Sequence, residues 1–204
     1  MKNLKKLSAV LVSMLMLVTM LVGCGGPKLT PDESATIVLD IVLKADNSKL
    51  DSVKMTQEEF DKVRKEMEDA MMSQFDSAGV SIKDETKTNL LNAILEGMKK
   101  VEYEVKTVSE DKEQATVDVS IKGIDMKKMT EDLQADVTKY VTENPTLSQD
   151  ELLDYTFNKE AELIKNASIS ETAKTITITL TNEGNVWVPN ESDMFKIGSS
   201  IMSN

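Results

Sequence analysis

The sequence predicts an α+β fold in which an antiparallel sheet of two hairpins packs on a core helix. Two pairs of segments alternate apolar and polar residues, and a short polar turn joins each pair, which is the pattern of β-hairpins. The other segments carry apolar residues at three- and four-residue spacing, which is typical of amphipathic helices. The order is three helices, a hairpin, two helices, a hairpin and a short tail. This order favours the α+β class over α/β.

The first helix begins at Thr30, where Pro31 and Glu33 complete a capping box, and we expect it to run to about Ala45. Its apolar residues occupy most of the circumference: Ile37, Val38, Leu39, Ile41, Val42 and Leu43. A helix that is apolar on most sides needs cover on more than one side. We therefore interpret it as the central core helix.

The second and third helices each begin at a capping pair, Thr56 with Glu59 and Ser81 with Asp84. The second helix is amphipathic and is predicted to end near Ser77, because Gly79 stops the periodic pattern. The third is predicted to end at Lys99 and Lys100, whose charges complement the helix dipole.

The predicted strands cover residues 101–106 and 115–121 in the first hairpin and 175–181 and 186–188 in the second. The turns are Ser109 to Lys112 and Glu183-Gly184-Asn185. Between the hairpins, helical spacing runs from Met126 until Asn144-Pro145 breaks it, and a fifth helix follows the cap at Ser148. Each hairpin has one polar face, which we expect to lie in water.

The composition excludes several kinds of chemistry. The chain has 204 residues, enough for one domain, and it contains no histidine and one cysteine, Cys24. Without histidine there is no Ser-His-Asp triad and no histidine-ligated metal. The glycines form no phosphate-binding motif, and a net charge of −11 argues against nucleic acid as a partner. We therefore expect no catalytic residue, no cofactor and no metal.

The first 24 residues look like a bacterial lipoprotein signal, or lipobox. A basic N-terminal segment with three lysines precedes an apolar run over residues 7–22. The small residue Gly23 then precedes Cys24, whose thiol can accept a diacylglycerol group. A transmembrane helix is the alternative. The run is shorter than the roughly 20 residues of a span, and Gly-Gly-Pro follows it instead of a basic cluster.

The signal predicts three parts: a signal peptide over residues 1–23, a lipidated tether over 24–29 and a single domain over 30–204. Acyl chains such as palmitate on Cys24 would anchor the protein in the cell membrane, on its extracytoplasmic face. Loss of the signal leaves 21 basic and 35 acidic residues, a balance of −14. This acidic body is repelled by an anionic membrane surface, so we expect the lipid alone to hold it there.

The chain as a whole resembles a family of uncharacterised lipoproteins from Gram-positive bacteria. The resemblance rests on Cys24, Lys44-Ala45-Asp46-Asn47-Ser48, the strands 115–121 and 175–181, and Val186-Trp187-Val188. It implies a cystatin-like or nuclear-transport-factor-like cone and a location, but no activity. The helical insertion from Asp125 to Ala167 departs from the simplest cone and is similar to the lipoprotein branch.

Tyr103 and Trp187 are the candidate pocket residues, because a cone can leave an apolar pocket between its sheet and its core helix. Core packing is the alternative for both. For Trp187, burial would need a bulge or a covering tail over Met194 to Met202, since strand alternation sets it on the face opposite Val186 and Val188.

The functional hypothesis is a lipid-anchored binding or interaction domain with an unknown ligand or protein partner, and not an enzyme. One alternative is a cone-fold enzyme in which a carboxylate and Tyr103 perform acid-base chemistry. Another is a structural partner of a membrane complex. The polar outer faces of both hairpins predict a monomer.

Overall fold

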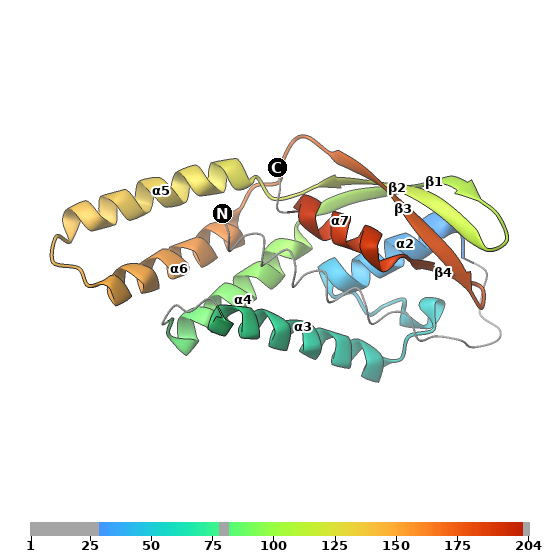
Figure 1. Ribbon diagram of the computed structural model, residues 1–204, viewed down its shortest axis with the longest axis horizontal. Helices are drawn as coiled ribbons and strands as arrows, with labels where there is room; N and C mark the ends of the chain where they lie inside the picture. Colours follow the sequence, from blue (N-terminus) through green and yellow to red (C-terminus); the bar gives the residue numbers. More distant parts are fainter. Residues whose placement is uncertain (1–28, 78–81, 202–204) are drawn as a thin grey trace.

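The computed structural model describes residues 29–77 and 82–201, and it confirms the α+β class (Figure 1). Its helices are α2 (Pro31–Leu39), α3 (Gln57–Ser77), α4 (Asp84–Lys99), α5 (Met126–Glu143), α6 (Gln149–Asn166) and α7 (Glu191–Ile201). Its strands are β1 (Glu102–Glu110), β2 (Gln114–Lys122), β3 (Lys174–Glu183) and β4 (Val186–Pro189). A π-helical turn (Asp40–Lys44) continues α2, and a 3-10 turn (Leu50–Val53) precedes α3.

The four strands form one antiparallel sheet in the order β1-β2-β3-β4. On its inner face Val117 lies opposite Ile178 and Val119 opposite Ile176, while threonines of β3 occupy the outer face. Helix α2 packs against β1, β2 and β4, and α7 packs against β2 and β3. The polar outer face and the covered inner face therefore follow the predicted alternation.

Helix α2 is the central helix that the sequence predicts. Its apolar side chains are buried from Ala35 to Leu43. The helical segment reaches Lys44 as predicted, but its last turn is π-helical and closes at Ala45, which adopts a left-handed conformation with φ of 54°. One extra residue in the turn changes which side chains face the sheet, and this bears on the site described below.

The predicted caps are confirmed at three helices. Thr30, Thr56 and Ser148 all form reciprocal capping boxes, with Glu33, Glu59 and Glu151 respectively. Helix α4, in contrast, has Lys83 at its N-cap position without a side-chain cap. The proposed cap Ser81 and the stop at Gly79 lie outside the described residues.

The predicted C-terminal tail is a helix, α7, and it closes the core. Met194, Ile197 and Ile201 are buried. The backbone of Gly123 approaches so closely that a Cβ atom there would lie 2.4 Å from the Ile201 carbonyl oxygen. The amide of Ile124 donates to the same oxygen, so the last turn of α7 is fastened to the end of the first hairpin.

Helices α5 and α6 form an antiparallel arm that projects from one end of the molecule (Figure 1). The arm leaves the sheet after Lys122, at the end of β2 that is farthest from the β1–β2 turn. Helix α2 begins at the opposite end of the sheet (Figure 1), where Asp32 bonds to Thr107. The first described residues and the arm thus lie at opposite ends of the molecule.

Candidate functional site

The first polar site joins the edge strand β1 to the π-helical turn. Tyr103 is half-buried on the inner face of β1, and its hydroxyl donates a hydrogen bond to Oδ1 of Asp40. The Lys44 ammonium lies 4.7 Å from the centroid of the Tyr103 ring and 3.7 Å from Asp40 Oδ1. The phenol, the carboxylate and the cation therefore form one compact group.

The electrostatics of this group make Tyr103 a donor. Burial raises the pKa of Tyr103 above its ordinary value, and the hydrogen bond to Asp40 raises that pKa further. Both effects favour the protonated phenol, which is the form that can donate to the carboxylate.

A second hydroxyl–carboxylate pair lies farther along the same two elements, where Thr107 donates to Asp32 over 2.7 Å. Eight residues separate Asp32 from Asp40, about 12 Å of helix, and four separate Tyr103 from Thr107, about 13 Å of strand. The two spacings match, so both pairs form at once. Together they hold α2 and its π-helical turn against β1.

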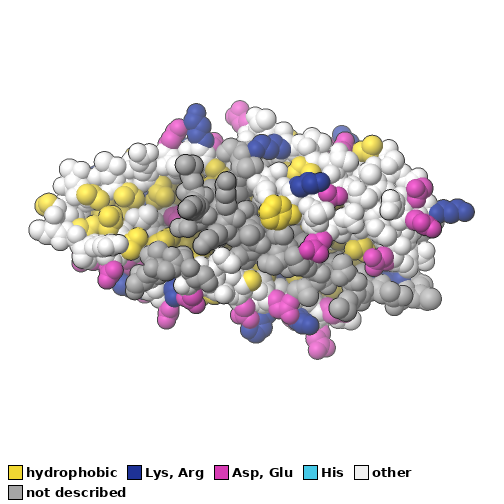
Figure 2. Space-filling model, in the orientation of Figure 1, with side chains coloured by type: hydrophobic (Ala, Val, Ile, Leu, Met, Phe, Trp, Pro, Cys, Tyr) yellow, Lys and Arg dark blue, Asp and Glu magenta, His cyan; other side chains and the backbone are white. Residues whose placement is uncertain are grey.

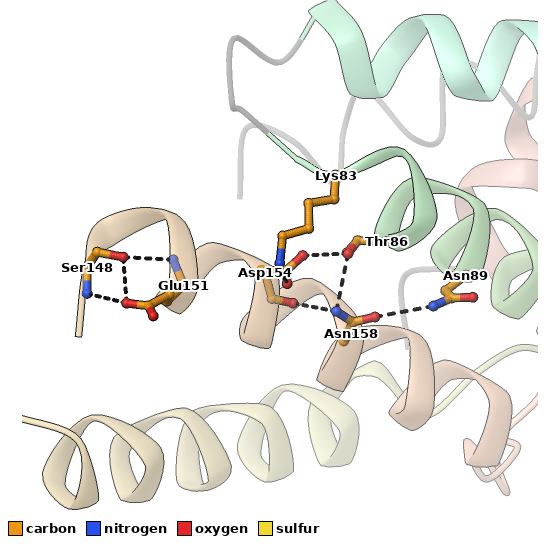
Figure 3. A network of polar contacts seen from close by, with 7 residues as sticks. All are labelled: Lys83, Thr86, Asn89, Ser148, Glu151, Asp154 and Asn158. Atoms are coloured by element: carbon orange, nitrogen blue, oxygen red, sulfur yellow. Dashed lines mark hydrogen bonds and ion pairs between the residues drawn. The ribbon is translucent and has the colours of Figure 1, made fainter.

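A larger polar network connects α4 with α6 (Figure 3). The Asp154 carboxylate accepts hydrogen bonds from Lys83 Nζ at 2.6 Å and from Thr86 Oγ1 at 2.5 Å. Asn158 donates to Thr86 Oγ1 and accepts from Asn89. The Lys83 bond, and secondly the Thr86 bond, lower the pKa of Asp154. This arrangement orients α6 on α4 and keeps the buried Thr86 hydroxyl fully used.

A cavity of about 210 Å³ lies beside this network, lined by Ile82, Lys83, Asp150, Glu151 and Asp154. Two of its three carboxylates already have partners within the protein. Asp154 pairs with Lys83, and Glu151 forms the capping box of α6 with Ser148. Within the described residues no group of three or more acidic, cysteine or histidine side chains has the geometry of a metal site.

The arm has its own packing. The rings of Tyr140 and Tyr155 stack with centroids 3.6 Å apart and planes 3° apart, and Lys159 pairs with Asp136 at 3.0 Å. Toward the tip α5 and α6 are the only helices in the described part of the chain, so much apolar surface stays partly exposed. The side chains concerned are Leu133, Val137, Val141, Leu152 and Leu153. Figure 2 shows hydrophobic side chains gathered over the part of the molecule where Figure 1 places α5 and α6.

The sequence-derived candidates are not brought together by the structure. Tyr103 is on β1 and Trp187 on β4, the two outer strands of the sheet. Trp187 is only 2% exposed, and neither it nor Tyr103 lines the cavity beside α6. Cys24 lies outside the described residues.

Two site residues were missed by the sequence reasoning. Asp40 is the one acid within the apolar run 37–43, and that isolation was a usable signal. Asp154 gives no such signal, because its partners Lys83 and Thr86 stand about 70 residues away in the chain.

Comparisons with known proteins give a family and a fold. A family model described as "Domain of unknown function (DUF5105)" matches residues 28–201. No curated protein matches the chain. Among solved structures, YcdA from Bacillus subtilis, described there as a candidate lipoprotein, has a similar fold, with a TM-score of 0.70 and 20% sequence identity. The match covers 87% of this chain and 57% of that chain, so this chain spans little more than half of that relative.

Proposed function

The chain belongs to the DUF5105 family, and from its own geometry we propose that it is a lipid-anchored extracytoplasmic domain that acts by binding a partner. The proposed body is a cystatin-like or nuclear-transport-factor-like cone, with the sheet around α2. Its outer end is the α5–α6 arm.

The anchoring part of the proposal rests on Cys24 and the basic and apolar residues before it. The fold neighbour is itself described as a candidate lipoprotein, which supports the same assignment here. In the two described segments no helix is long and apolar enough to cross a bilayer. Two acyl chains on one cysteine are sufficient for stable attachment.

The binding part rests on one observation, the uncovered apolar surface of the arm. The polar sites described above hold elements of the fold together: Asp40 with Tyr103, Asp32 with Thr107, and Asp154 with Lys83 and Thr86. The arm extends beyond the body and leaves Val141 43% exposed one turn from the half-buried Val137, whereas the other large apolar residues described as exposed, Val108 and Phe195, lie on β1 and α7. Exposed apolar surface on a soluble domain is typical of an interaction site.

The arm also lies where a partner can reach it. Strand β2 spans about 30 Å and α5 about 27 Å, which sets the tip of the arm on the order of 55 Å from the start of α2. The tether from Cys24 to Leu29 extends at most about 18 Å. An anchor at Cys24 would therefore let the domain stand with its arm directed away from the membrane.

A second candidate, acid-base catalysis, is favoured by the carboxylate that Asp40 sets beside Tyr103. Two features support binding instead. The raised pKa of Tyr103 keeps the phenol protonated, so it is a poor base at neutral pH. In addition, Lys44 and Tyr103 both occupy the same oxygen of Asp40, which leaves little room for a substrate.

Fractionation and complementation test the proposal. Wild-type protein should partition into the membrane fraction and the detergent phase, and its intact mass should include a diacylglycerol group. The Cys24→Ala variant should be released into the aqueous fraction. In a deletion strain, Tyr103→Phe should restore whatever phenotype is lost, provided the variant folds. Retained lipid on Cys24→Ala would remove the anchoring proposal, and a folded Tyr103→Phe without rescue would favour catalysis.

A further inference from the structure

Helix α6 has three sides, and among the described helices only α4 and α5 pack closely on it, on two of those sides. Asp154, Asn158 and Ile164 face α4, as their contacts with Thr86 and Gly97 show. Tyr155 and Lys159 face α5, through Tyr140 and Asp136.

The third side of α6 is a half-buried strip of mostly apolar residues, which we call the α6 strip. Its members are Leu152, Leu153, Thr156, Glu160 and Leu163. Leu163 at the C-terminal end of the strip packs on the core, whereas Leu152 and Leu153 do not. The strip extends over about 17 Å, or three helical turns.

Glu160 is the one charged residue of this strip, and it has no hydrogen bond or ion pair with another described residue. Its neighbour Lys159 is directed to the α5 side, where it pairs with Asp136 at 3.0 Å and Glu162 at 3.1 Å. Burial raises the pKa of Glu160, and no hydrogen bond or cation offsets the effect. A half-buried carboxylate without a partner destabilises the fold. Its presence therefore points to a role in binding another molecule.

We propose that the α6 strip is the docking surface for an amphipathic helix of another protein, which presents a lysine or arginine to Glu160. The proposal rests on the binding function above and specifies its partner. Apolar residues on both sides of a single carboxylate match a helix with an apolar face and one cation within it. Three turns is the length over which such helices commonly dock in a groove.

Charge disfavours two other occupants of the strip, a second copy of the chain and a membrane surface. A second copy of the chain, packed by two-fold symmetry, would bring one unpaired Glu160 toward another without a cation between them. A membrane surface is disfavoured because the body is acidic and the arm lies at the end opposite the start of α2. A cationic partner helix instead supplies the missing counter-charge, which gives both attraction and register.

The test uses residues 28–204, because the buried core of the described residues runs from Ala35 to Ile201. Binding is measured by fluorescence anisotropy for two labelled 18-residue amphipathic peptides, one of leucine and lysine and one of leucine and glutamate. We expect the lysine peptide to bind at least tenfold more tightly. Glu160→Gln should weaken its binding about tenfold, and the matched variant Glu162→Gln, on the α5 side of the same helix, should change it less than twofold.

Other results would overturn the proposal. Equal losses for Glu160→Gln and Glu162→Gln would mean general attraction to an acidic protein. Leu153→Ala should also weaken binding of the lysine peptide. Unchanged binding would show that the peptide binds somewhere other than the α6 strip. A dimer mass that Leu153→Ala abolishes would identify a second copy as the occupant, and co-sedimentation with zwitterionic vesicles that Leu153→Ala abolishes would identify a membrane surface. Whether the Cys24→Ala variant leaves the membrane tests only the anchor. Failure of the anchoring proposal is therefore distinguishable from failure of the proposed docking at the α6 strip.

Discussion

The Tyr103 hydroxyl donates a hydrogen bond to Asp40, across the contact between the edge strand β1 and the π-helical turn that ends the central helix. A π-helical turn is an uncommon conformation that needs support from its surroundings. Here the support comes from the phenol above it and from Lys44, which contacts both partners. The pair therefore stabilises the one irregular turn of the core helix.

Tyr103→Phe should reduce the free energy of unfolding by about 1 to 3 kcal/mol, because it removes a hydrogen bond to a charged group and leaves a partly buried carboxylate with less support. Urea unfolding followed by circular dichroism measures the change. Tyr140→Phe is a matched control, since that ring stacks in the arm away from Asp40. A loss as large for Tyr140→Phe would contradict a specific role of the Asp40 bond.

Thr107→Val should destabilise the protein in a pH-dependent way. The Thr107 hydrogen bond is the main cause that lowers the pKa of Asp32. A lowered folded-state pKa contributes stability above the unfolded value of about 3.9, and this contribution is lost as pH falls through the folded value. The difference between wild type and Thr107→Val should thus be full at pH 7 and small near pH 2. A difference independent of pH would mean that only packing was changed.

Trp187→Ala should cost about 3 to 5 kcal/mol of stability, because it empties a large buried volume. Trp187 is 2% exposed and lies on the inner face of β4, opposite Asn182 and on the same face as Leu180. As the sole tryptophan, it should give a blue-shifted emission that is protected from quenchers. Emission like that of free indole, together with normal folding of Trp187→Ala, would show the ring to be exposed.

Glu160→Gln should stabilise the isolated protein at neutral pH. Burial raises the pKa of Glu160, so folding is favoured when this group is protonated, and the favourable contribution is lost as pH rises from the unfolded value through the folded one. The urea midpoint of the variant should exceed that of wild type at pH 7, and the two should converge below about pH 4, under the unfolded pKa. A lower midpoint at pH 7 would show that Glu160 has a stabilising partner in the folded chain.

Local patterns in the sequence determined most of the elements. The capping boxes at Thr30 and Ser148, the alternation of β2 and β3, and the circumferential apolar residues of the first helix each depend on neighbours within a few positions. Such signals are readable without the fold, because they report backbone hydrogen bonding and side-chain direction within one element. The helix α7 was missed although Met194, Ile197 and Ile201 recur at three- and four-residue spacing, because Gly198-Ser199-Ser200 lowers the helix propensity of the segment.

The tertiary structure decided which of these residues meet. Asp40 and Tyr103 are 63 positions apart, and Asp154 lies 68 positions from Thr86, so no local pattern connects them. It also decided the burial of Trp187, because strand alternation alone does not say which face of β4 is covered. Helix α2 packs against β4, and Val186 and Val188 on the opposite face are buried too. The sequence by itself thus determined most of the elements and the acidic charge, and it predicts the anchor at Cys24. The pairs, the arm and the α6 strip depend on contacts between distant segments, whose free energy arises only when the chain is packed.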